Sequence, residues 1–165
     1  MGDMKKLLVI SLVAVVLVSP VSALSEEQTS EISQSCSTIK QHLKNLQLAD
    51  SRTRSFLGTA YQDFLVSYIT PLNVNLVKNN RPSTTISGIY SDILDTRAKF
   101  NSRFTTYSQI FEQLLAMDCQ KEPENFYAKI EEAREARGKL ESSTKKMRSL
   151  LGNHYTAVQK LEEGL

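Results

Sequence analysis

The sequence predicts an all-α fold, an elongated antiparallel three-helix bundle with coiled-coil-like packing and one disulfide. Apolar residues recur at spacings of three and four along nearly all of the chain after residue 23, and no stretch alternates at period two for long enough to suggest a sheet. The only two cysteines are Cys36 and Cys119. In a helical hairpin that turns near residue 77, residues whose numbers add to about 155 face each other, and these two cysteines satisfy that rule.

Residues 1–23 have the pattern of a secretory signal peptide. Lys5 and Lys6 supply the charged region, Leu7–Val18 is an apolar run, and a small-residue cleavage site ends at Ala23. An uncleaved membrane anchor is the alternative, because the apolar run is close to the shortest length that spans a bilayer. We therefore expect export to the periplasm, the cell surface or the extracellular space.

Export would affect the oxidation state of the two cysteines, and removal of residues 1–23 sets the length of the folded part. Outside the cytoplasm the environment permits oxidation, so we expect Cys36 and Cys119 to be paired. Residues 24–165 are long enough for a single domain with one core. The full chain carries 20 Lys and Arg against 18 Asp and Glu, and this near balance gives no argument for nucleic acid binding.

The first helix is expected over about residues 27–70. Pro71 should end or kink it, because the residue before a proline avoids the α region. The asparagine-rich segment 71–83 is then the first hairpin connection, partly packed as an irregular cap over the end of the bundle. The apolar stripe of this helix contains Ile32, Cys36, Ile39, Leu43, Leu46, Asp50, Thr53, Leu57, Ala60 and Phe64.

Two further helices are expected over about residues 84–118 and 123–163. Ser83 or Thr84 can cap the second helix, and Pro123 suits the first turn of the third, where its missing N–H costs nothing. The stripe of the second helix contains Ile86, Ile89, Ile93, Phe100, Phe104, Tyr107, Phe111, Leu114 and Met117. The stripe of the third contains Phe126, Ile130, Ala133, Arg137, Leu140, Thr144, Met147, Leu151, His154, Val158 and Leu161.

A carboxylate, Asp50, occupies a core position of the first helix, and the same facing rule puts Arg137 of the third helix beside it. Arg54 lies one turn farther along, and Arg103 is within a turn on the second helix. A buried carboxylate is tolerable only when it is paired or hydrogen-bonded. We expect a structural polar layer that fixes the helix register, with a polar binding pocket as the alternative. This layer would consist of Asp50, Arg54, Arg103 and Arg137, flanked by Thr53 and Thr105.

The sequence contains few residues or motifs that could act in catalysis or bind a metal or cofactor. His154 lies on the apolar stripe of the third helix, where we expect it to bond Tyr68, because His42 belongs to the opposite half of the rod and cannot complete a metal or haem site. No haem-attachment, phosphate-loop or nucleophile-elbow motif occurs. We expect no enzyme, no cofactor and no metal. The basic run Lys145, Lys146 and Arg148 could meet an anionic polymer or lipid headgroups, but glutamates up to Glu141 lie three or four residues from Arg134, Arg137, Lys139 and Lys145, as on a solvated helix face.

Several short motifs spread over most of the chain after residue 23. They are Cys36-x-x-Ile39-Lys40-x-x-Leu43, Pro71-Leu72-Asn73, Asp118-Cys119 and Pro123-x-x-Phe126-Tyr127. In these motifs the chain resembles uncharacterised secreted helical proteins of reduced-genome candidate-phylum bacteria. The resemblance implies secretion, helices and paired cysteines, and it implies no activity.

We expect the chain to be a protein-interaction or scaffold module of the cell envelope or extracellular space. Its partner would be a protein of unknown identity, and it would meet a membrane only through residues 1–23 if these are retained. Two alternatives stay open: a periplasmic holdase-like chaperone, which needs an exposed apolar groove or a cavity-forming oligomer, and a membrane-anchored stalk or adhesin. The sequence leaves the oligomeric state undecided.

Overall fold

The computed structural model describes residues 24–81 and 83–163. The predicted signal peptide, residues 1–23, lies outside the described residues. The described part of the chain contains four α-helices, one π-helix and no strand, so the all-α class is confirmed. None of the helices in residues 24–81 and 83–163 combines the length and hydrophobicity that a bilayer-spanning segment needs.

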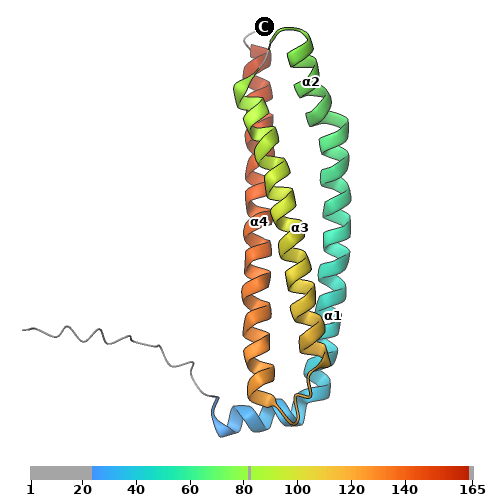
Figure 1. The fold of residues 1–165 in the computed structure, drawn as a ribbon, viewed down its shortest axis with the longest axis vertical. Coiled ribbons are helices and arrows are strands. Elements are labelled where there is room, and N and C mark those ends of the chain that lie inside the picture. Colours follow the sequence, from blue (N-terminus) through green and yellow to red (C-terminus); the bar gives the residue numbers. More distant parts are fainter. Residues whose placement is uncertain (1–23, 82, 164–165) are drawn as a thin grey trace, which may run out of the picture.

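The helices run up and down the long axis of the molecule (Figure 1). α1 (Glu26–Phe64), η1 (Leu65–Ile69) and α2 (Thr70–Lys78) follow one another without a break and together form what we call the first arm, residues 26–78. α3 (Thr84–Ala116) returns in the opposite direction, and α4 (Pro123–Glu163) runs back beside α3. The first turns of α1 lie across the lower end of the molecule (Figure 1).

The helix starts follow local capping rules. Ser25 and Gln28 form a capping box at the start of α1. The Ser83 hydroxyl accepts a hydrogen bond from the Ile86 amide at the start of α3, so Ser83 is the N-cap there. Pro123 is the first residue of α4, as its missing N–H predicts.

The first arm differs from the prediction of a helix that ends near residue 70. The Thr70 amide donates to the Leu65 carbonyl, five residues back, and the π-helix is continuous with α2, in which Pro71 occupies the first turn. A proline inside a regular α-helix loses one hydrogen bond and clashes with the preceding turn. The wider π turn makes room for the ring, so the helix continues to Lys78 instead of becoming an irregular cap. For this reason four α-helices replace the three that were expected.

The turn after α2 occupies only the end of the asparagine-rich segment. Asn80 has a positive φ of 54°, in the left-handed region that asparagine tolerates. The Arg81 amide donates to the Leu76 carbonyl at 2.9 Å and the Asn80 amide to the Val77 carbonyl at 3.1 Å. These two bonds form a Schellman motif, which ends the helix and reverses the chain.

The two cysteines form the predicted disulfide. Cys36 in α1 and Cys119 after α3 have Cα atoms 5.6 Å apart, and both are buried. The Ser33 hydroxyl donates to the Gln120 carbonyl beside them. This end of the first arm is therefore tied covalently to the connection between α3 and α4.

The hydrophobic core divides into two clusters, one at each end of the bundle. The cluster at the disulfide end includes Tyr107, Phe111 and Phe126, and the other includes Ile69 and Met147. Among its described residues α1 buries only Cys36, whereas α3 buries seven residues and α4 buries eight. The α3–α4 hairpin thus carries most of the core, and the middle of α1 packs against it loosely.

Candidate functional site

A polar layer connects the three helices in the middle of the molecule. The Asp50 carboxylate of α1 accepts hydrogen bonds from Arg137 of α4, from Nε at 2.9 Å and from Nη2 at 3.0 Å. The Tyr107 hydroxyl of α3 donates to the same carboxylate at 2.6 Å. Asp50 and Arg137, which the facing rule pairs, therefore lie together, and Tyr107 joins them from the third side.

The layer stabilises the ionised carboxylate. Burial by itself raises the pKa of Asp50, but the hydrogen bonds from Arg137 and Tyr107 outweigh that effect and hold the pKa below its ordinary value. Burial and the neighbouring carboxylate raise the pKa of Tyr107, so its hydroxyl stays a donor. The Arg137 side chain is 54% exposed against 20% for Asp50, which places the pair at the flank of the bundle.

Two members of the predicted layer have other partners. Arg54 lies over the ring of Phe104, with Cζ 4.6 Å from the ring centroid, a cation–π arrangement. Arg103 donates to the Lys139 carbonyl at 3.0 Å and to the Ser143 hydroxyl at 2.7 Å. The expectation of one layer containing all four charged residues is therefore wrong, because α3 directs Arg103 toward α4 and away from α1.

Of the two flanking threonines, Thr53 lines the same cavity as Asp50 and Arg137, in agreement with the prediction, whereas Thr105 does not. The hydroxyls of Thr53 and Thr105 donate to carbonyls of their own helices, those of Ala49 and Asn101, and both residues are exposed. Tyr107 takes the expected place of Thr105, two residues farther along α3. The position of Tyr107 on the apolar stripe could have identified it from the sequence. A tyrosine on that stripe is expected to be buried, and a buried tyrosine needs a hydrogen-bond partner for its hydroxyl.

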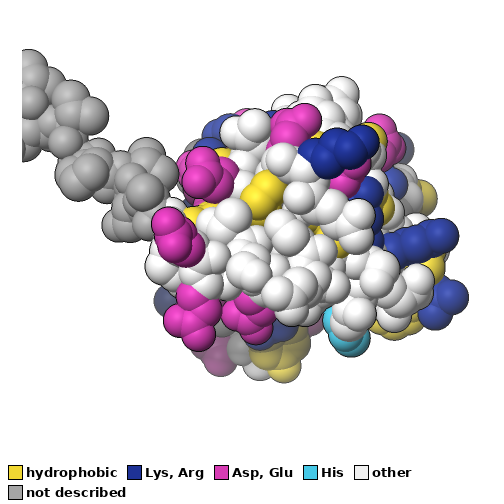
Figure 2. All heavy atoms as spheres, turned by 90° about the horizontal axis from the view of Figure 1, so that it is seen from below, with side chains coloured by type: hydrophobic (Ala, Val, Ile, Leu, Met, Phe, Trp, Pro, Cys, Tyr) yellow, Lys and Arg dark blue, Asp and Glu magenta, His cyan; other side chains and the backbone are white. Residues whose placement is uncertain are grey.

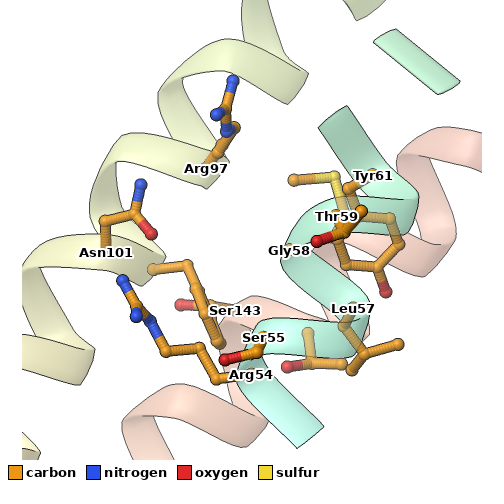
Figure 3. A pocket seen from close by; sticks show the side chains of 12 residues that line it. Arg54, Ser55, Leu57, Gly58, Thr59, Tyr61, Arg97, Asn101 and Ser143 are labelled. Carbon is orange, nitrogen blue, oxygen red and sulfur yellow. The ribbon is translucent and has the colours of Figure 1, made fainter. Parts of the chain in front are cut away.

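Between the two hydrophobic clusters lies a cavity of about 370 Å³, which we call the mid-bundle cavity (Figure 3). A second cavity of about 310 Å³ adjoins the Asp50–Arg137 pair, and Arg54 and Leu57 belong to the walls of both. The mid-bundle cavity exists because α1 carries small and polar side chains here and does not close against α3 and α4. Its walls are formed by Arg54, Ser55, Leu57, Gly58, Thr59 and Tyr61 of α1, Arg97, Phe100 and Asn101 of α3, and Ser143, Thr144 and Met147 of α4.

The walls of the mid-bundle cavity contain two guanidinium groups and no carboxylate. Such a lining favours an anion over a cation. The walls also carry the hydroxyls of Ser55, Thr59, Tyr61, Ser143 and Thr144, with no histidine or carboxylate of the lining beside them to act as a base. Throughout residues 24–81 and 83–163, no group of three or more His, Cys, Asp or Glu residues could hold a metal ion.

His154 does not have the predicted environment. It is buried, its Nε2 atom has no hydrogen-bond partner, and its ring meets the Phe64 ring edge-on at 6.3 Å between centroids. Tyr68 is 65% exposed, so the expected bond to it is wrong. The π turn is the reason, because it rotates the side chains of this segment about the helix axis relative to a regular α-helix. Leu65 and Ile69 therefore point into the core, and Tyr68 does not.

The buried imidazole predicts a pH dependence of stability. Burial lowers the pKa of His154 below its ordinary value of 6.5, so the unfolded chain takes up a proton at a higher pH than the folded protein does. Stability is therefore complete above about pH 7 and falls as the pH drops through 6.5. Urea unfolding of a His154→Phe variant should lack this loss, so the stability of the variant relative to the unmodified protein should rise as the pH falls below 6.5.

The other histidine provides the control for this prediction. His42 is exposed, so a His42→Phe variant should keep the pH dependence of the unmodified protein. If the His154→Phe variant retained the same slope, the assignment of the dependence to the buried imidazole would be wrong.

The basic run of α4 lies on a solvated helix face, as its spacing predicts. Lys145 pairs with Glu141 at 2.7 Å, Lys139 pairs with Glu135 at 2.6 Å, and Arg134 pairs with Glu131. These are pairs of exposed groups three or four residues apart on one helix, each of small energetic value. The run is therefore a weak candidate for binding an anionic surface.

No protein-family model matches the chain, and no curated protein or solved structure does either.

Proposed function

We propose that this chain is an exported helical-bundle protein that works as a protein-interaction or scaffold module in the cell envelope or extracellular space, without catalysis. In this proposal the first arm counts as one interrupted rod, so the architecture is an antiparallel three-helix bundle with coiled-coil-like packing. The contact surface for a protein partner is the exposed side of the first arm.

The distribution of exposed hydrophobic side chains is the observation that carries the proposal. Eight large hydrophobic side chains in the described residues are exposed, and six of them lie on the first arm. Phe56 is the most exposed at 73%. Exposed apolar and aromatic side chains that concentrate on one part of a molecule are typical of surfaces that bind other proteins. The six are Leu48, Phe56, Val66, Tyr68, Val74 and Val77.

The end of the molecule near the disulfide offers less apolar surface. Figure 2, which views the molecule from that end, shows acidic side chains mainly on one side, basic side chains mainly on the other and only small hydrophobic areas between them. A partner that buries apolar surface is therefore better matched by the long side of the first arm than by this end.

The compartment in the proposal follows from the disulfide. A buried disulfide fits a non-reducing environment. The signal-like pattern of residues 1–23 and the resemblance to secreted helical proteins support export. The absence of catalysis is supported by the titratable groups, because the buried Tyr107 and His154 lie outside the walls of both cavities and the Asp50 carboxylate, in the wall of the second, is already paired with Arg137.

A photo-crosslinking residue at position 56, introduced in cells that produce the protein, tests the contact surface. We expect crosslinked adducts with one or a few other proteins from position 56 and none from Lys146, which is exposed on α4. A Val66→Glu substitution should weaken the adducts formed from position 56, because a charge on the contact surface must be desolvated on binding.

The same experiment separates the alternatives. Equal adduct yields at positions 56 and 146, or no adduct at either, would rule out the first arm as the contact surface. A broad ladder of many partners would favour the holdase-like chaperone. An intact mass of the exported protein that still includes residues 1–23 would favour the anchored stalk or adhesin.

A further inference from the structure

The mid-bundle cavity has a polar side and an apolar side. Figure 3 shows the long side chain of Arg54 reaching from α1 toward α3, where Asn101 lies, while Leu57 and Tyr61 lie on the opposite side of the view. Phe100 and Met147 add further apolar surface to the walls. A ligand that fills this cavity needs a polar head and an apolar body.

The charged side chains of the cavity walls favour a ligand whose polar head carries a negative charge. Arg54 and Arg97 both belong to the walls, and no Asp or Glu side chain does. Arg97 is half-buried and makes no ion pair with any described residue. Arg54 is held over Phe104 without a carboxylate partner, so both guanidinium groups keep their donors for an anion.

A glycine keeps space open at the wall of the cavity. Gly58 lies in the interior of α1, where glycine costs about 1 kcal/mol of helix stability relative to alanine. A Cβ atom added at Gly58 would meet no atom of a neighbouring residue within 4 Å. The helix therefore accepts a side chain at this position, and that side chain would reduce the space available to a ligand.

We propose that the mid-bundle cavity binds an amphiphilic organic anion, a medium-length acyl or alkyl chain with a carboxylate or phosphate head. Arg54 and Arg97 each offer a guanidinium group to the head, and the chain lies against Leu57, Tyr61 and Met147. A volume of about 370 Å³ falls within the range of small-molecule sites. This inference goes beyond the interaction module, because it assigns a small-molecule ligand to a cleft between α1, α3 and α4.

Titration calorimetry of the full chain with decanoate, decyl phosphate and decyltrimethylammonium, all below their micelle concentrations, tests the proposal. We expect saturable one-to-one binding of decanoate, of decyl phosphate or of both, and the pattern identifies the preferred head group. Decyltrimethylammonium has the same chain and the opposite charge, so it should not bind. Binding of all three with similar affinity, or of none, would overturn the proposal.

Two pairs of variants locate the binding. An Arg97→Gln or Arg54→Gln substitution should weaken binding about tenfold, because a charge-assisted hydrogen bond is lost. Arg52→Gln makes the same change in charge at an exposed residue outside the cavity walls and should leave the affinity unchanged.

The second pair changes the space and leaves the charge unaltered. Gly58→Leu should abolish binding, whereas Gly138→Leu, at a glycine in α4 that also has open space around it, should not. Leucine favours helix more than glycine does, so both variants are expected to fold, and circular dichroism checks this. Equal affinities of the Gly58→Leu and Gly138→Leu variants would place the ligand elsewhere and overturn the assignment.

Discussion

Reduction of the Cys36–Cys119 disulfide is expected to lower the midpoint of thermal unfolding by on the order of 10 °C. The two cysteines are 83 residues apart in sequence, and closing a loop of that length in the unfolded chain corresponds to about 4 kcal/mol of loop-closure entropy. For a domain of this size each 1 kcal/mol shifts the midpoint by about 2–4 °C. Circular dichroism melts with and without reductant measure the shift.

The structure also predicts where reduction acts first. Because α1 buries only Cys36 among its described residues, the covalent bond is a large part of what holds the lower end of the first arm on the α3–α4 hairpin. Hydrogen exchange should therefore increase more in α1 than in α3 or α4 after reduction.

A double Cys36→Ser and Cys119→Ser variant is the control. It should melt near the reduced protein and should not respond to reductant, since the chain has only these two cysteines. An unchanged midpoint on complete reduction of the unmodified protein would mean that noncovalent packing alone holds the first arm in place.

Replacing Asp50 by alanine is expected to lower the free energy of unfolding by about 2 kcal/mol. The substitution leaves the hydroxyl of Tyr107, a residue that is only 1% exposed, without its acceptor, and an unsatisfied buried polar group costs about 1–3 kcal/mol. It also removes the paired hydrogen bonds from Arg137, whose contribution is reduced because that side chain is half-exposed. Urea unfolding at neutral pH measures the loss.

The control for this effect is Asp63→Ala, which removes an exposed carboxylate from the same helix and should change stability by less than about 0.5 kcal/mol. The Tyr107→Phe substitution should lower the free energy of unfolding of the unmodified protein by about 1 kcal/mol. In the Asp50→Ala variant the same substitution should leave the free energy of unfolding nearly unchanged or raise it, because it removes the unpaired hydroxyl. Additive effects of the two substitutions would show that the residues are not coupled.

Acid should remove the contribution of Asp50. The folded-state pKa of Asp50 lies below its ordinary value of 3.8, so the contribution is complete above that value and is lost as the pH falls through the folded-state pKa. The stability difference between the unmodified protein and the Asp50→Ala variant should therefore shrink below about pH 4. A difference that stayed constant to lower pH would contradict the ion-pair origin of the effect.

Sequence reasoning predicted the parts of the fold that depend on local periodicity and on one long-range rule. The regular 4-3 spacing of residues 123–163 predicted α4 at its observed bounds. The facing rule paired Cys36 with Cys119 and brought Asp50 to Arg137. The facing rule placed Thr105 beside Asp50, where the structure has Tyr107. A difference of two residues along α3 decides which side chain points toward α1.

The π-helix accounts for the main error in the fold and for one in the site. Pro71 predicted that the helix ends or kinks, with the end placed near residue 70, but the wider turn at residues 65–69 accommodates the proline and the helix continues. The same turn moves Tyr68 to the surface and leaves His154 against Phe64. A proline in the sequence predicts that a regular α-helix is interrupted. Whether the helix ends there or continues through a π turn depends on the core that it packs against.

By itself the sequence determined that the chain is helical and that its two cysteines pair, because helix periodicity and disulfide register follow from the order of the residues along the chain. Only the tertiary structure decided that α1 packs loosely in the middle, that Tyr107 completes the Asp50–Arg137 pair, and that Arg54 and Arg97 line one cavity. Those features depend on the relative rotation and separation of three helices. Packing at the two hydrophobic clusters sets these quantities, and the pattern of any single helix does not contain them.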